Sequence, residues 1–244
     1  MEKSLLEITD VCAEVHKKPV LNGVNLRIEK GRVYALLGPN GSGKSSLAQT
    51  ISGNPLYHVT GGHMCFEGKS ITALPPEKRV ALGLALCLQN PPAVKGVTLA
   101  SLLDVIGKGK KYAGPEIVSG DLLSRDVNAG FSGGEKKLSE FEQIVALKPK
   151  LVIFDEIDSG LDVKNVALLA KLITRKLIKH KITVLFITHA GTILDAITPD
   201  VTYVLLDGRI ICTSENFKDV LTTIKKYGYE KCRQCTLLAG RSQG

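Results

Sequence analysis

The stretch Gly38-Pro39-Asn40-Gly41-Ser42-Gly43-Lys44-Ser45 has the form G-x-x-x-x-G-K-[ST] of a phosphate-binding loop. It follows the apolar run Val33–Leu37 and opens a helix-like segment, which is the context that such a loop needs. The glycines let the backbone curl so that several N–H groups point at one phosphate, and the helix N-terminus adds a positive field. We therefore predict that Lys44 pairs with the β- and γ-phosphates of a nucleotide, that Ser45 ligates Mg²⁺, and that Ser46 belongs to the same site.

Two acids, Asp155 and Glu156, follow the apolar run Leu151–Phe154 much later in the chain. In a phosphate-loop fold, such a strand brings its C-terminal acid to the metal, so Asp155 is predicted to hold Mg²⁺ directly or through water. Glu156 would face the γ-phosphate, where a base for the attacking water is needed. Two acids after a strand are, on their own, a common start of a solvated loop. The phosphate loop upstream favours the catalytic interpretation.

Length and composition limit the possible classes of protein. The chain has 244 residues, of which 44% are hydrophobic and 23% charged, ordinary values for a globular protein with one sizeable core. Disorder of most of the chain and a transmembrane helix are not expected. The formal net charge of +8 permits anionic partners but specifies none. The N-terminal MEKSLLEITD lacks the design of a secretory signal and the six cysteines are scattered, so we expect a cytoplasmic location.

Short apolar runs alternate with helix-like segments along the chain. Several runs are almost continuous Val, Ile and Leu, as is typical of buried parallel strands. The alternation predicts βαβ units in a layered α/β core, and the strand signals before Lys44 indicate an antiparallel β subdomain beside it. Asp207-Gly208 indicates a hairpin turn. Strands are expected at Leu5–Ile8, Val24–Ile28, Val33–Leu37, Leu84–Leu88, Leu151–Phe154, Thr183–Ile187, Val201–Leu206 and Arg209–Cys212, and helices at Lys44–Ile51, Glu77–Leu82, Leu99–Val105, Gly134–Leu147, Val163–Ile178, Thr192–Ile197 and Phe217–Lys226.

The stretch from Asn90 to Asn128 has a different character. It carries prolines and glycines, and its hydrophobic periodicity is weak. We interpret it as a small inserted helical lobe. The basic run Lys108–Lys111 within it is expected to be a solvated loop tip, because no nucleic-acid-reading motif accompanies it. The polar tail from Lys231 to Gly244 is expected to fray.

The stretch Phe131-Ser132-Gly133-Gly134-Glu135 precedes the two acids and opens a helix-like segment. Alone it is a weak signal, equally typical of a helix cap. Together with the phosphate loop and the carboxylates, it resembles the signature motif of ATP-binding cassette (ABC) ATPases. Further motifs that resemble those of this family occur in its order: Gln89 at the Q-loop position, Ser159-Gly160-Leu161-Asp162 at the D-loop position, and His189 at the switch position.

The resemblance covers nearly the whole chain and implies a fold. The implied class is α/β, a P-loop NTPase ABC cassette: a RecA-like mixed sheet core with an antiparallel β subdomain, plus a small helical subdomain. We expect one ATPase domain over residues 1–230, with the catalytic core and β subdomain at 1–89 and 129–230. The helical insert is expected at 90–128 and a flexible tail at 231–244.

The same resemblance implies an ATPase that uses ATP and Mg²⁺. Glu156, His189 and Gln89 are the residues that it implies to be catalytic. Gln89 is also an implied Mg²⁺ ligand, beside Ser45 and Asp155.

The resemblance further implies a homodimer of ATPase subunits, formed head to tail when ATP binds. The signature of one copy would then contact the γ-phosphate bound to the other copy. Its contacting residues would be Ser132, Gly133 and Gly134.

Finer details are similar to the ATPase of the SUF iron–sulfur cluster assembly system, the SufC family. That resemblance implies SufB- and SufD-type scaffold proteins as partners, without nucleic acid and without direct membrane insertion. The ATP-binding subunit of an ABC transporter remains the alternative. A nucleic-acid-associated ABC ATPase is disfavoured, because the chain has one cassette and no heptad insertion. The details lie in Asn128–Lys137, Asp158–Asp162, Ile193–Asp200 and Gly208–Ile210.

Three features depart from the family pattern. No Tyr, Phe or Trp stands where the family usually stacks adenine, so Val15, Val20 or His16 is expected to contact the base. The helical insert is short, which suggests an assembly with one scaffold type rather than two. Cys232 and Cys235 form a single C-x-x-C pair. A closed zinc or cluster site needs four ligands, so a polar tail is the favoured interpretation and a four-cysteine site between two copies is the alternative.

Overall fold

The computed structural model describes residues 4–107, 117–188, 192–229 and 231–232. Its strands are β1 (Ser4–Val15), β2 (Lys18–Glu29), β3 (Val33–Leu37), β4 (Tyr57–Phe66), β5 (Lys69–Ser70), β6 (Leu84–Cys87), β7 (Leu151–Asp155), β8 (Thr183–Ile187), β9 (Val201–Leu206) and β10 (Arg209–Ser214). Its helices are α1 (Lys44–Ser52), α2 (Pro76–Leu82), α3 (Leu99–Ile106), α4 (Gly120–Leu123), α5 (Gly133–Ala146), α6 (Val163–Lys176), α7 (Thr192–Ala196) and α8 (Phe217–Tyr227), with a 3₁₀ turn at Ile178–His180.

A six-stranded sheet in the order β10-β9-β3-β8-β7-β6 forms the centre of the molecule. Its strands run parallel except β10, which forms an antiparallel hairpin with β9. β3, β7, β8 and β9 are buried along their whole length, which explains their nearly continuous apolar sequences. Because the strands are parallel, the loops that follow β3, β6, β7 and β8 meet at one edge of this sheet.

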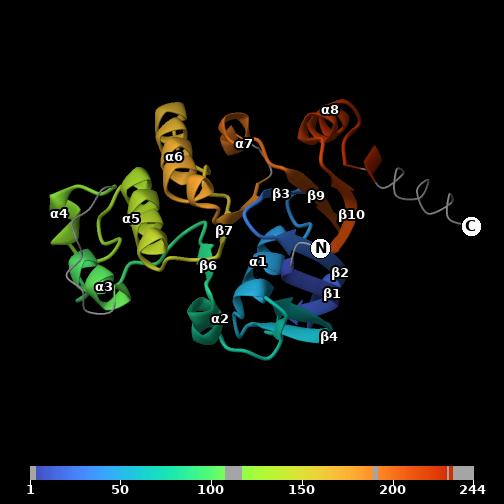
Figure 1. The fold of residues 1–244 in the computed structure, drawn as a ribbon, viewed down its shortest axis with the longest axis horizontal. Coiled ribbons are helices and arrows are strands. Elements are labelled where there is room, and N and C mark those ends of the chain that lie inside the picture. The colour runs from blue at the N-terminus through green and yellow to red at the C-terminus, as the bar shows by residue number, and fades with distance from the viewer. Residues whose placement is uncertain (1–3, 108–116, 189–191, 230, 233–244) are drawn as a thin grey trace, which may run out of the picture.

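The two faces of the sheet are covered by different layers (Figure 1). On one face, Tyr34 and Leu36 of β3 join a core with Leu47 of α1 and the buried side chains of the second sheet. On the other face, Ala35 joins a core with Leu169 of α6 and apolar residues of α5, α7 and α8. Alternate residues of one strand thus contact opposite layers, as the two-residue period of a strand requires.

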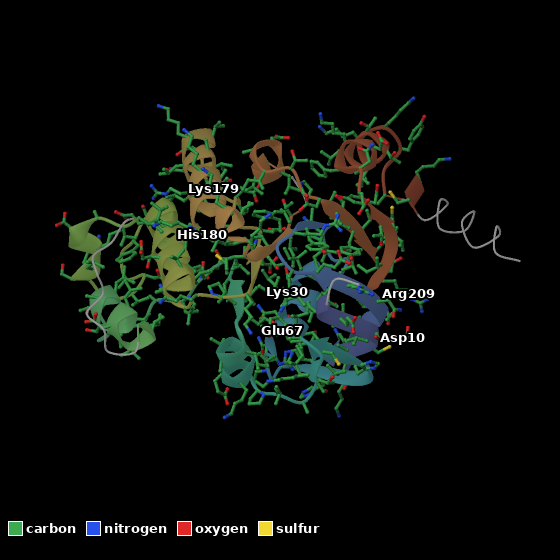
Figure 2. All side chains as sticks on the ribbon, viewed as in Figure 1. Asp10, Lys30, Glu67, Lys179, His180 and Arg209 are labelled. Atoms are coloured by element: carbon green, nitrogen blue, oxygen red, sulfur yellow. The ribbon has the colours of Figure 1, made fainter. Side chains whose placement is uncertain are left out.

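The second sheet is antiparallel, in the order β2-β1-β4-β5. A two-residue turn joins β1 to β2, and both His16 and Lys17 have positive φ there, as in the tight turns that suit a twisted hairpin. Glu67, directly after β4, forms ion pairs with Lys30 at 2.6 Å and with Lys150 at 2.5 Å. Figure 2 labels Lys30 and Glu67 beside each other. Since Lys150 precedes β7, the carboxylate of Glu67 links the two sheets.

A third, smaller core lies under the helices at one end of the molecule, where Figure 1 shows α3 and α4 beyond α5. Leu99 and Leu103 of α3 pack there with Leu122 of α4 and with Phe131. This region contains the predicted helical insert, although the domain boundaries stay a prediction. The basic run Lys108–Lys111 lies outside the described residues. Within the described ranges, no helix is both long enough and apolar enough to cross a membrane.

The predicted fold class is confirmed, but the prediction missed β4, β5 and α4. β4 was missed because Gly61 and Gly62 interrupt its apolar alternation. Gly62 lies opposite a bulge in β1, where an added Cβ would come within 2.3 Å of the Asp10 carbonyl oxygen. α4 has only four residues, too few for a helical period to be recognised. The hairpin turn at Asp207-Gly208 is present, with positive φ at both residues.

Candidate functional site

The phosphate loop connects the buried strand β3 to α1, which begins at Lys44. Gly38 has no room for a side chain, because an added Cβ would lie 2.3 Å from the Leu205 carbonyl oxygen. The Lys44 Nζ donates to the carbonyl oxygens of Gly38 at 2.8 Å and Pro39 at 3.0 Å. Burial lowers the pKa of Lys44, whereas the carboxylates of Glu156 and Asp155 raise it. The cation therefore lies across the loop, in a setting where an anionic phosphate would stabilise it.

Ser45 and Asp155 are brought together by the loop ends of α1 and β7. The Ser45 Oγ donates to the Asp155 Oδ1 at 3.1 Å. Burial raises the pKa of Asp155, and the hydrogen bond from Ser45 lowers it. A hydroxyl and a carboxylate oxygen side by side fit Mg²⁺, which prefers oxygen ligands and takes the others from water and phosphate. Among the described residues, no group of three or more His, Cys, Asp or Glu gathers as a metal site.

Gln89 and Glu156 also meet at this edge. The Gln89 Nε2 donates to the Glu156 Oε2 at 2.5 Å. Glu156 has a φ of 50°, a backbone conformation that few non-glycine residues adopt, and its N–H donates to the Ile187 carbonyl oxygen at 2.9 Å. This hydrogen bond to β8 fixes the turn after β7. It presents the Glu156 carboxylate beside the phosphate loop.

A cavity of about 540 Å³ opens above these groups. One end of it carries the phosphate-loop residues Asn40, Gly41, Gly43, Lys44, Ser45 and Ser46, with Gln89 and Glu156. The other end is formed by Pro19, Val20, Asn22, Asp207 and Gly208. The two hairpin segments therefore contribute the apolar side chains of Pro19 and Val20 together with the polar residues Asn22 and Asp207.

Tertiary hydrogen bonds hold these two segments against the phosphate loop. The Gly208 N–H donates to the Ser42 carbonyl oxygen at 2.9 Å, and the Asn22 N–H donates to the Gly208 carbonyl oxygen at 2.9 Å. An added Cβ on Gly43 would lie 2.9 Å from the Val20 carbonyl oxygen. Val20 was one of the three expected base contacts and lines the cavity, whereas Val15 and His16 are not among its lining residues.

The signature residues lie apart from this cavity in a single chain. Ser132 is exposed at the start of α5 and forms a capping box, in which its Oγ accepts from the Glu135 N–H at 3.3 Å. Gly133 and Gly134 begin the helix. None of the three lines the cavity. The first turn of α5 is therefore well formed, and Gly133 is exposed, as contact with another molecule would require.

The D-loop stretch leads into α6, whose N-cap is Asp162: its carboxylate accepts from the Asn165 N–H at 2.9 Å. Asp158 accepts from the Ile193 N–H at 3.0 Å, which ties this stretch to α7. The predicted switch residue His189 lies outside the described residues.

The cysteines that the structure describes are not disulfide-bonded. Cys232 is buried and belongs to the core beside α8, while Cys235 lies outside the described residues. Cys87 is also buried, and Cys12, Cys65 and Cys212 are half-buried. Burial of Cys232 among apolar side chains supports a packing role for that residue.

Sequence patterns did not identify Pro19, Asn22, Asp207 and Gly208 as site residues. Asp207-Gly208 was recognisable as a turn, but nothing local in the sequence says that this turn reaches the phosphate loop.

A family model described as "ABC transporter" matches residues 21–159 of the chain. The chain is 38% identical over 245 residues to "Probable ATP-dependent transporter ycf16" of Antithamnion sp., covering 93% of this chain and 96% of the relative. It is 35% identical over 251 residues to "Vegetative protein 296" of Bacillus subtilis (strain 168), covering 96% of this chain and 95% of the relative.

Solved structures agree on the fold. An ATP-binding cassette of an ABC transporter in its ADP conformation superposes with a TM-score of 0.75 at 24% identity, covering 94% of this chain and 98% of that chain. A second cassette, solved as a dimer in a post-hydrolysis state with ADP and phosphate, superposes with a TM-score of 0.69 at 19% identity, covering 86% of this chain and 98% of that chain. At these identities, the two structures support the fold alone.

Proposed function

The chain belongs to the ABC transporter ATPase family, and on that premise we propose that it is the ATPase subunit that drives conformational change in a SufB/SufD-type scaffold during iron–sulfur cluster assembly. ATP binding and hydrolysis follow from the family. The residue roles, the scaffold partner and the cytoplasmic location are the proposal.

The phosphate end of the cavity suits the triphosphate of ATP. Lys44 would move its hydrogen bonds from the Gly38 and Pro39 carbonyls to the β- and γ-phosphates. Ser45 and Asp155 would hold Mg²⁺, which supplies charge stabilisation to the phosphates when it is bound. The neighbouring backbone N–H groups of the glycine-rich turn add further donors.

Glu156 is the candidate base, because its carboxylate is held beside the phosphate loop by Gln89 at 2.5 Å. This contact is the single observation that carries the catalytic proposal. In the reaction, Glu156 would accept the proton of the water that attacks the γ-phosphate. Gln89 would keep the carboxylate oriented, and catalysis would otherwise rest on positioning and charge stabilisation.

The opposite end of the cavity suits the base. Pro19 and Val20 line it, next to Gly208. Neither residue carries an aromatic ring, so both would contact the faces of adenine by van der Waals packing, and Asn22 and Asp207 add polar groups to the same lining.

The separation of the signature from the cavity supports a site shared between two copies. In the proposed head-to-tail homodimer, Ser132 and the N–H groups of Gly133 and Gly134 would contact the γ-phosphate held by the partner. ATP would then close the dimer and hydrolysis would release it, which moves any proteins attached to the two copies.

The scaffold role is supported by sequence details of the signature and D-loop regions, Asn128–Lys137 and Asp158–Asp162. The short insert at 90–128 further suggests one scaffold type. The alternative is a transporter subunit, which is favoured by the names of several relatives, among them "Probable ABC transporter ATP-binding protein spyM18_0273" of Streptococcus pyogenes.

One affinity purification from native cells separates the two functions. The tagged full chain is expected to retain a scaffold protein without membrane spans in the absence of detergent. Recovery of an integral membrane protein, only after detergent extraction, would favour the transporter function. Two distinct scaffold subunits would contradict the single-scaffold assembly.

A further inference from the structure

Helix α5 holds the backbone around Gln89 with two buried charged side chains. The Lys137 Nζ donates to the carbonyl oxygens of Leu88 at 2.9 Å and Gln89 at 2.7 Å. From the next turn of the helix, the Glu140 Oε1 accepts from the Leu88 N–H at 2.6 Å. Lys137 thus donates to the two carbonyl oxygens, and Glu140 accepts from the N–H group. Both backbone polar groups of Leu88 are therefore hydrogen-bonded to side chains of α5.

Both side chains are removed from water at this contact. Lys137 is 5% exposed and Glu140 is 7% exposed. Burial raises the pKa of Glu140, while the Cys87 side chain, the Leu88 N–H and the charge of Lys137 act in the opposite direction. Charge-assisted hydrogen bonds of this kind are short and strong. The backbone of Leu88 and Gln89 is therefore held against α5.

The same helix begins at the signature. Ser132 is the N-cap of α5, and Lys137 and Glu140 lie in its following turns. Gln89, whose backbone Lys137 holds, donates from its side chain to Glu156. The proposed trans contact at Ser132 and the proposed base at Glu156 are thus joined by one helix and one hydrogen-bonded loop.

We infer that Lys137 and Glu140 are positioning residues, which set the place of Gln89 and so link the signature of one nucleotide site to the base of the other. The inference rests on the proposed roles of Gln89 and Glu156. A shift of α5 when Ser132 meets a partner's nucleotide would be passed to the Gln89 backbone through Lys137. Misplacement of a catalytic group by about 1 Å can cost about 100-fold in rate, so a small shift is sufficient.

A double-mutant cycle on the full chain tests this. The variants are Lys137→Met, Gln89→Ala and the combination, measured for kcat, KM and equilibrium binding of ATP. Lys137→Met is expected to lower kcat by about 10- to 100-fold while ATP affinity stays within about twofold, since Lys137 does not line the cavity. Because Lys137 is inferred to act through Gln89, Lys137→Met should lower kcat by no more than about twofold further in the Gln89→Ala background.

Controls separate positioning from folding. Lys137→Arg keeps the cation and its donors and should restore at least part of kcat. Lys171→Met makes the same change of charge and size on the exposed side of α6 and should leave kcat unchanged. If Lys137→Met does not fold, Glu140→Met takes its place in the cycle, since it removes the acceptor of the Leu88 N–H at similar volume.

Three outcomes would overturn the inference. One is a wild-type kcat in the folded Lys137→Met variant, alongside a reduced kcat in Gln89→Ala. The second is a fully multiplicative loss in the double variant, which would mean that Lys137 does not act through Gln89. The third is a wild-type kcat in Gln89→Ala, which would contradict the proposed role of Gln89 as well.

Discussion

The side-chain amide of Gln89 donates a hydrogen bond of 2.5 Å to the carboxylate of Glu156. The two residues follow the parallel neighbours β6 and β7, so the sheet itself brings their loops together. The carboxylate thereby has a fixed place beside Lys44, the only buried lysine of the cavity wall among the described residues.

Lys44→Ala should lower ATP affinity by about 100-fold, because hydrogen bonds from a cation to phosphate oxygens are each worth a few kcal/mol. Lys44 also donates to the carbonyl oxygens of Gly38 and Pro39, so the melting temperature of the variant is measured to check that it folds. Titration calorimetry with ATP and Mg²⁺ measures the affinity. Lys69→Ala on exposed β5 is the matched control and should bind normally. Unchanged affinity in Lys44→Ala would show that Lys44 does not contact the phosphates.

Ser132→Arg should leave ATP binding to a single chain intact and block turnover, because the bulky cation would separate the two copies. The variant also loses the capping bond to Glu135, which costs about 1 kcal/mol of stability. Binding and steady-state phosphate release are compared in the same preparation. Ser119→Arg, at the exposed N-cap of α4, is the control. A fully active Ser132→Arg variant would rule out the shared site.

These predictions rest partly on residues that local sequence could reveal and partly on residues that it could not. Lys44 and Ser45 lie within one eight-residue motif, and Asp155 and Glu156 stand at the end of one apolar strand and directly after it, so their meeting at one edge of the sheet was predictable. By contrast, the contacts of Lys137 with Leu88 join segments that are distant in the chain. Helical periodicity predicts only that Lys137 is a polar residue of a helix. It cannot predict that the side chain is buried and donates to main-chain carbonyl oxygens.

The strands were likewise predictable only where the local sequence carries the signal. Strands β3, β7 and β8 were predictable because burial on both faces requires continuous apolar residues. Much of β4 is exposed to solvent, and its register depends on the bulge opposite Gly62. That geometry arises only once β1 and β4 pair.

Glu67 should make stability depend on pH. Its hydrogen bonds with Lys150 and Lys30 lower its pKa from 4.5 to about 2. The folded state therefore keeps the carboxylate charged while the unfolded state takes up a proton. The stabilisation is fully present above pH 4.5 and is lost as the pH falls towards 2. Both lysines are about half exposed, so solvent screening limits the contribution to about 1 kcal/mol.

The measurement is urea unfolding of wild type and Glu67→Gln at several pH values. Glu67→Gln should be less stable at pH 7, and the difference should shrink as the pH falls below 4.5. Glu77→Gln, an exposed acid at the start of α2, should show no such difference. A difference between wild type and Glu67→Gln that stays constant with pH would contradict the ion-pair explanation.

The most direct test of the proposed mechanism is ATP turnover by Glu156→Gln. Glutamine keeps an oxygen that can accept the hydrogen bond from Gln89, so the site should keep its shape and ATP affinity should stay within about twofold of wild type. Loss of a general base should lower kcat by about 100-fold or more, while the matched change Glu77→Gln should leave it unaltered. Phosphate release at the wild-type rate by Glu156→Gln, with normal ATP binding, would contradict the assignment of Glu156 as the base.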